Sequence, residues 1–112
     1  MVYTLKGGES MKKMKKINNY VEFRHEGVES VRNHISDTPI KGKETVLKYL
    51  KSWPNEGIRC ETLVDYIKAE TLTPSVWTHT DGEYRWTDEE IYHFEKYNMQ
   101  LDKDFLAKVG VA

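Results

Sequence analysis

The sequence predicts an α+β fold in which one small antiparallel sheet packs against helices. Three features support this class: a hairpin signal at Asp81–Gly82, an amphipathic pattern over Glu44–Trp53, and a helix-capping motif that begins at Thr87. The chain has 112 residues, enough for one hydrophobic core, and no repeat or proline-rich linker divides it. We therefore expect a single domain over residues 15–112, preceded by a basic segment over residues 1–14.

The composition argues against several classes of protein. With 38% hydrophobic and 31% charged residues, the chain is neither collagen-like nor wholly disordered. No apolar run approaches the ~20 residues of a membrane span, so we expect no membrane partner. The single cysteine, Cys60, cannot form an internal disulfide, which favours a buried, inert thiol and a cytoplasmic location. A net charge of -1 makes nucleic acid an unlikely principal partner.

The N-terminal half contains one clear helix. Ile17–Glu22 is too short to distinguish helix from strand, whereas apolar residues at helical spacing predict a short helix over Val28–Ile35, which Pro39 ends. The pattern over Glu44–Trp53 predicts an amphipathic helix, which Pro54 terminates. Its apolar stripe comprises Val46, Leu47, Leu50 and Trp53.

The segment Ile58–Lys68 fits a helix or a strand. Its apolar residues match both periods, so the pattern alone does not decide between them. We favour a strand because Gly57 precedes the segment and a hairpin follows it.

The hairpin is predicted to join Val76–Thr80 to Glu83–Trp86 through a two-residue type I′ turn. That register places Trp77 opposite Trp86. One face then carries the aromatic residues Trp77, His79, Tyr84 and Trp86. This face is either the core side, covered by the Glu44–Trp53 helix, or an aromatic surface that binds a peptide or stacks on bases; we favour the core side.

Two helices are predicted after the hairpin. Thr87 and Glu90 form a capping-box pattern, which predicts a helix that runs to about Asn98. Asp102 is placed to cap a last short helix. The residues expected to face the core from these helices are Ile91, Phe94, Phe105, Leu106 and Val109.

Charge is distributed unevenly along the chain. Residues 81–104 contain eight acidic and three basic residues, an excess of -5, while residues 1–16 carry +4. We expect a protein-interaction module that presents an acidic surface to a basic protein partner. The acids expected to bind that partner are Asp88, Glu89, Glu95 and Asp104. The alternative is a nucleic-acid or nucleoprotein binder that uses the basic N-terminal segment around Lys12–Lys16.

A small enzyme is the second alternative. The chain lacks a nucleophile motif, a phosphate-binding loop and histidines at metal-ligand spacing, so we expect no catalytic residue, no metal and no cofactor. The residues that could support acid–base catalysis are a group of carboxylates and His93, which follows Glu89 by four residues. We expect His93 instead to be a surface or half-buried residue near Tyr92 and Tyr97.

The C-terminal half resembles a family of small uncharacterised bacterial proteins. The resemblance rests on D-G-E-Y-R-W at Asp81–Trp86, I-Y-H-F-E-K-Y-N at Ile91–Asn98, and the L-x-x-x-F spacing from Leu101 to Phe105. The family has no assigned activity, so the resemblance implies no functional residue. It implies a bacterial or phage setting and an independently folding domain, and by analogy an immunity-like role.

Overall fold

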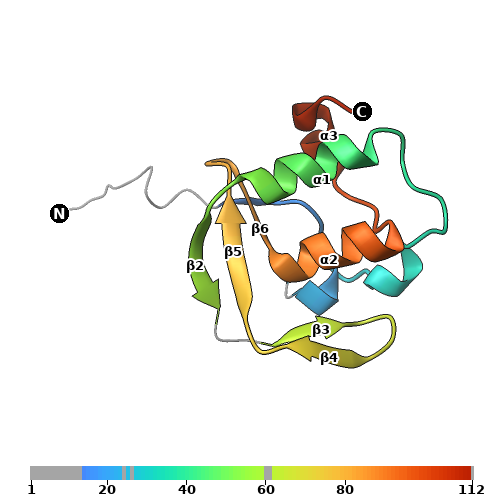
Figure 1. Cartoon of the computed structure of the whole chain (residues 1–112). Coiled ribbons are helices and arrows are strands. Elements are labelled where there is room, and N and C mark those ends of the chain that lie inside the picture. The colour runs from blue at the N-terminus through green and yellow to red at the C-terminus, as the bar shows by residue number, and fades with distance from the viewer. Residues whose placement is uncertain (1–13, 24, 26, 60–61, 112) are drawn as a thin grey trace.

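The structure, a computed structural model, describes residues 14–23, 25, 27–59 and 62–111. Its strands form two sheets. Helices α1 (Lys43–Ser52) and α2 (Asp88–Tyr97) lie on one side of the larger sheet, and α3 (Lys103–Val109) packs against α1 (Figure 1). This arrangement confirms the predicted α+β class. Each helix in the described ranges is too short and too polar to cross a membrane.

The larger sheet has the strand order β1–β6–β5–β2. These strands are β1 (Lys15–Lys16), β6 (Tyr84–Thr87), β5 (Val76–Thr80) and β2 (Asn55–Arg59). Strand β5 pairs antiparallel with β6 and β2, whereas β1 pairs parallel with β6. The parallel pair is an addition to the predicted antiparallel sheet, and it brings β1 beside the start of β6.

The hairpin register differs from the predicted one. His79, and not Trp77, lies opposite Trp86, and the connection between the strands is residues 81–83 rather than Asp81–Gly82 alone. The prediction of a two-residue turn is therefore wrong. Because the register has moved by two residues, each side chain keeps its predicted face of the sheet.

The Asp81 side chain explains the longer connection. Its Oδ1 accepts the backbone N–H of Glu83 at 2.8 Å and that of Tyr84 at 2.7 Å. A short acidic side chain thus satisfies turn N–H groups that strand pairing would otherwise satisfy. Gly82 adopts φ 97°, in the left-handed region that favours glycine.

Helix α1 covers the aromatic side of the hairpin. It begins and ends within one residue of the predicted bounds, with Val46 and Leu50 buried. Trp86 is fully buried beneath it and donates its Nε1–H to the Leu50 carbonyl oxygen at 3.2 Å. Phe105 of α3 completes this part of the core, with its ring centroid 5.9 Å from that of Trp86.

Both predicted caps in the C-terminal half are confirmed. The Thr87 side chain accepts the Glu90 N–H while the Glu90 carboxylate accepts the Thr87 N–H, so the capping box is complete. Asn98 ends α2 in the left-handed region, with φ 55°. Asp102 caps α3 by accepting the backbone N–H of Phe105 at 3.0 Å.

The strand predicted over Ile58–Lys68 is correct in part. Strand β2 ends at Arg59, and β3 (Leu63–Asp65) pairs antiparallel with β4 (Glu70–Thr73) in a second sheet. The intervening residues 66–69 form a turn rather than a continuation of the strand. Cys60, which is expected to be buried, lies outside the described residues.

The helix predicted over Val28–Ile35 is wrong. The structure has only a 3₁₀ turn at residues 31–33, and Val28 is 88% exposed. The Glu22 carboxylate accepts the Ser30 hydroxyl at 2.5 Å and the N–H of residue 31 at 2.9 Å. These bonds from a side chain compete with a continuous helical ladder. The same Glu22 belongs to a second 3₁₀ turn, Val21–Phe23, in the segment that the sequence leaves undecided.

Candidate functional site

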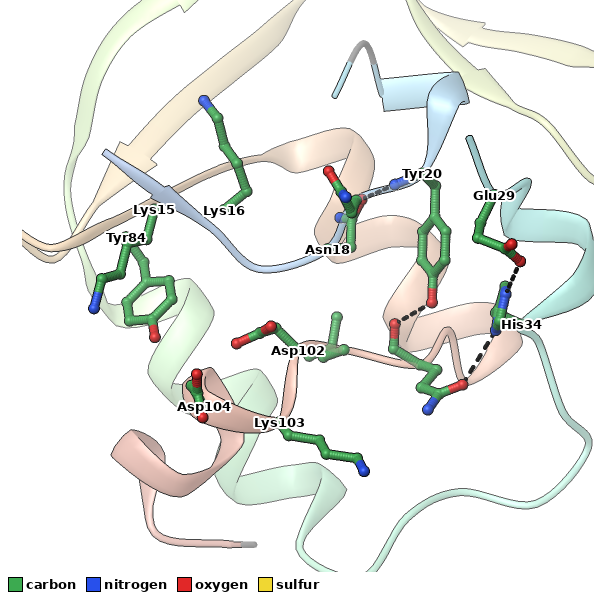
Figure 2. Close-up of a pocket in the computed structure, with 13 residues that line it drawn as sticks. Lys15, Lys16, Asn18, Tyr20, Glu29, His34, Tyr84, Asp102, Lys103 and Asp104 are labelled. Atoms are coloured by element: carbon green, nitrogen blue, oxygen red, sulfur yellow. Dashed lines mark hydrogen bonds and ion pairs between the residues drawn. The ribbon is translucent and has the colours of Figure 1, made fainter. Parts of the chain in front are cut away.

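A pocket of about 580 Å³ lies where the N-terminal strand meets the C-terminal part of the chain (Figure 2). Its walls come from residues 15–20, the loop around residues 29–34, Tyr84, and residues 100–104. The volume is within the roughly 300–1,000 Å³ that is typical of small-ligand sites. The pocket is therefore the candidate functional site.

Backbone hydrogen bonds hold the two main walls together. The Lys15 N–H donates to the Glu83 carbonyl oxygen at 3.0 Å, and the Asp102 N–H donates to the Ile17 carbonyl oxygen at 2.8 Å. Ile17 is fully buried in the core. The strand that carries the first wall is thus fixed to both the hairpin and the start of α3.

Tyr84 presents its hydroxyl to the pocket. Its ring packs edge-on against Phe105, with the centroids 5.1 Å apart, and the whole residue is only 3% exposed. Among the described residues its hydroxyl has no hydrogen-bond partner. Figure 2 shows this hydroxyl pointing toward the side of the pocket that carries Asp102 and Asp104.

The environment keeps the Tyr84 phenol protonated. Burial raises the pKa of Tyr84, and the charges of Asp102, Glu83 and Asp104 raise it further against the opposing effect of Lys15. A neutral phenol retains both its O–H donor and its acceptor lone pairs at physiological pH.

A four-residue ionic network lies behind the Tyr84 ring. Lys108 Nζ is 3.0 Å from an Asp81 carboxylate oxygen and 2.9 Å from one of Glu83, while Lys15 Nζ is 2.9 Å from Glu83. The two ammonium groups lie over the Tyr84 ring at 5.7 Å and 5.5 Å from its centroid. Two bases and two acids therefore balance one another, and this network adds no net charge to the pocket.

Two carboxylates at the start of α3 remain without an ion pair. Asp102 uses its Oδ2 to cap the helix, and Asp104 is exposed. Within the described ranges, neither residue lies within ion-pair distance of a base. The Tyr84 end of the pocket consequently combines a neutral hydroxyl with two carboxylates that form no ion pair, although the Lys15 charge acts on Asp104 at longer range.

The opposite end of the pocket is internally satisfied. The Tyr20 hydroxyl donates to the Gln100 carbonyl oxygen at 2.7 Å, and the Tyr20 ring stacks on His34 at 5.1 Å between centroids. His34 Nε2 lies 2.9 Å from a Glu29 carboxylate oxygen, and its Nδ1 lies 3.2 Å from the Gln100 side-chain oxygen. These hydrogen bonds raise the pKa of His34. The Tyr20 hydroxyl and both ring nitrogens of His34 are therefore bonded within the chain.

The four acids predicted to bind a partner do not form one surface. Asp88 bonds to His79 at 2.7 Å and also accepts the Trp77 N–H at 3.0 Å. Glu95 is exposed but forms an ion pair with Lys51 at 3.0 Å. Of the four, Asp104 is the one that lines the pocket.

The prediction that Glu89 is exposed is wrong. Its relative exposure is 8%, and its Oε2 accepts the Val64 backbone N–H at 2.7 Å. The cause is the second sheet, because β3 lies against α2 and turns an unpaired strand N–H toward the helix. The sequence places Glu89 in the first turn of the helix but does not indicate that a strand covers this turn.

His93 is buried, so its expected surface or half-buried position is also wrong. It has no exposed area, and its ring lies against Phe23, Tyr66 and Tyr92. Nε2 accepts the Tyr66 N–H at 3.0 Å and Nδ1–H donates to the Glu89 carbonyl oxygen at 2.8 Å. Burial lowers the pKa of His93. Neither ring nitrogen is available for acid–base chemistry.

The aromatic side of the hairpin belongs mainly to the core. Trp86 and Tyr84 are buried, and His79 Nδ1 faces the Trp53 carbonyl oxygen at 3.2 Å. Trp77 is 39% exposed. A continuous aromatic binding surface is therefore not formed by these residues.

The basic N-terminal segment is described only from residue 14 onward, so Lys12 and Lys13 lie outside the described residues. Lys15 is paired with Glu83, and Lys16 lines the pocket. In the part of the chain that the structure covers, no group of three histidine, cysteine, aspartate or glutamate side chains could hold a metal ion.

Comparisons with protein-family models, with curated proteins and with solved structures find no match to this chain. The resemblance to small bacterial proteins thus stays a prediction, and function must be inferred from the chemistry of the pocket. The sequence predicts Asp104 as a partner-binding acid, Tyr84 as a core residue and Asp102 as a cap. It gives no signal that the Tyr84 hydroxyl and Asp102 meet Asp104 at one pocket, because that requires knowing where β1 and α3 lie.

Proposed function

We propose that the protein is a cytoplasmic protein-interaction module that binds a partner with a basic surface, as an immunity-like or regulatory protein would. The supporting observation is the pair of acids at the pocket. Within residues 81–104, Asp102 and Asp104 are the acids that are neither ion-paired nor buried.

The other acids of that segment serve the fold. Asp81, Glu83, Asp88 and Glu95 have cationic or histidine partners, and Glu89 and Glu90 are buried with hydrogen bonds to the protein. Within residues 81–104, the acids that are neither ion-paired nor buried are therefore confined to Asp102 and Asp104 at the pocket. Unpaired charges in such a region attract an oppositely charged partner over about a Debye length, ~8–10 Å.

The alternatives have less support. A nucleic-acid binder would bring phosphates toward the unpaired Asp102 and Asp104, and Lys15 is already held by Glu83. An enzyme using His93 would need a ring nitrogen that reaches substrate, and both are bonded inside the core. The basic segment that precedes residue 14 remains the alternative binding element if the pocket acids have no effect.

Charge reversal tests the proposal through association kinetics. Asp104→Lys should slow association with a protein that co-purifies from the native host several-fold at low salt, and the difference should shrink as ionic strength rises. Glu95→Lys is the matched control, because Glu95 is an exposed acid of the same segment that lies outside the pocket. Circular dichroism verifies that both variants are folded.

An association rate that changes with neither the Asp104→Lys substitution nor ionic strength would contradict the proposal. Equal slowing by the two variants would contradict it as well, because the effect would then come from net charge and not from the pocket. In either case Trp77 and the basic segment become the next surfaces to vary.

A further inference from the structure

Resting on the proposed function, we infer that the Tyr84 end of the pocket receives an arginine side chain of the partner. Asp102 and Asp104 would bind the guanidinium, and the Tyr84 hydroxyl would accept one of its N–H groups. The inference assigns a ligand class to the pocket and a binding role to Tyr84.

The first observation behind this inference is the Tyr84 hydroxyl, which opens to the pocket and has no partner within the described chain. Tyr84 is 3% exposed, yet its hydroxyl bonds to no described residue and faces the pocket (Figure 2). A phenol hydroxyl at the wall of a pocket can donate a hydrogen bond to a ligand and accept one from it. By contrast, Tyr20 on the opposite wall has its hydroxyl bonded within the chain at 2.7 Å.

The charge around that hydroxyl favours a cation. Lys15 and Lys108 form ion pairs with Glu83 and Asp81, whereas Asp102 and Asp104 form no ion pair in the described ranges. The remaining bases on the pocket wall, Lys16 and Lys103, point away from Asp102 and Asp104 in Figure 2. An anion at the Tyr84 end would meet two carboxylates at close range.

The arrangement of acceptors favours a guanidinium over a simple ammonium. The Lys15 and Lys108 ammonium groups already lie over the Tyr84 ring, so a new cation reaches this residue through its hydroxyl and not by stacking. The acceptors are two carboxylates at the start of α3 and one hydroxyl on β6, and a cation that contacts all three must donate in several directions. The five N–H groups of arginine form such a fork, whereas a lysine ammonium offers three donors from one point.

The test uses N-acetyl-arginine amide, which carries the guanidinium without a charged backbone. Nuclear magnetic resonance of the isotope-labelled full chain should show saturable shifts confined to Tyr84 and residues 102–105. Tyr84→Phe keeps the ring packing and removes the hydroxyl, and should weaken binding about tenfold. Asp104→Asn should weaken it about threefold.

Control titrations define the specificity. N-acetyl-lysine amide should bind several-fold more weakly and N-acetyl-norleucine amide should give no localised shifts. Glu95→Gln should bind the arginine compound as the wild type does. Asp102→Asn can still cap α3, since asparagine is also a good N-cap, and so it isolates the loss of charge.

Wild-type affinity in Tyr84→Phe, or shifts scattered over every exposed acid, would overturn the inference. So would localised shifts with inorganic phosphate and none with the arginine compound, because the pocket would then take anions. This titration needs no partner, so it separates the two proposals. Arginine binding without an Asp104→Lys effect on partner association would leave the pocket assignment in place and reject the proposed function.

Discussion

Two groups of acids in the C-terminal half differ in what surrounds their carboxylates. The inner acids have buried carboxylates that accept hydrogen bonds from the chain; they are Asp65, Asp81, Glu89 and Glu90. The outer acids, Asp102 and Asp104, have exposed surface and no ion pair within the described part of the chain. The inner acids therefore stabilise the fold, whereas the outer acids remain free to bind.

Asp65 shows what an inner acid does. Its Oδ1 accepts the N–H groups of Ile67 and Lys68, each at 2.9 Å, and so closes the turn between β3 and β4. Its Oδ2 accepts the hydroxyls of Tyr92 at 2.6 Å and Tyr97 at 2.5 Å, which fixes the turn to α2. With four donors on one carboxylate, its charge is stabilised in place and is not presented to a partner.

The largest effect expected from this comparison is the loss of that carboxylate. Asp65→Ala leaves two backbone N–H groups and two phenols without their acceptor, and should lower the free energy of unfolding by about 3 kcal/mol. Urea denaturation followed by circular dichroism measures the change. Asp65→Asn is the control, since its amide oxygen can still accept the turn N–H groups, and it should cost clearly less. A loss within error for Asp65→Ala would mean that the second sheet is held by other contacts.

Acid should produce the next largest effect. Hydrogen bonds outweigh burial and hold the pKa of Asp65 below its ordinary value of 3.8, and they lower the pKa of Asp81 to about 2. Groups with a depressed folded pKa contribute stability that is complete above the unfolded pKa and is lost as pH falls toward the folded one. The free energy of unfolding should thus decrease from about pH 4 to about pH 2.

A pH series of denaturation curves measures that decrease. The slope should be shallower in Asp65→Asn, because one of the titrating carboxylates is gone. A slope equal to that of the wild type would show that Asp65 does not contribute to acid sensitivity.

The smallest effect is expected at the outer acids themselves. Asp104→Asn should change the free energy of unfolding by no more than about 0.5 kcal/mol, because the exposed side chain has no partner to lose. The same variant should still weaken arginine binding. If it destabilised the fold as strongly as an inner-acid variant does, the division into two groups would be wrong.

Local sequence patterns predicted the ends of the helices well. The Thr87–Glu90 box, the Asp102 cap and the bounds of α1 depend on neighbours in the chain, and all are confirmed. The faces of the hairpin are also as predicted, since a shift of two residues preserves alternation. The register itself was wrong because the Asp81 side chain enters the turn as a hydrogen-bond acceptor, which a dipeptide rule does not include.

Long-range contacts account for the predictions that failed. Glu89 and His93 are buried because β3 lies against α2, and Val28–Ile35 is not a helix because Glu22 bonds to the start of the 3₁₀ turn. The candidate site also depends on long-range contacts. Asp104 was predicted from local charge, but the role of Tyr84 depends on the position of β1 and α3, which no periodicity encodes.

The parallel pairing of β1 with β6 has a consequence for the growing chain. One wall of the pocket comes from residues 15–20 and the facing wall from residues 100–104, with almost the whole domain between them. During translation the first wall leaves the ribosome long before the second exists, and closing so long a loop requires most of the intervening chain to be folded. A ligand of this pocket would therefore distinguish the finished domain from a nascent or partly unfolded chain.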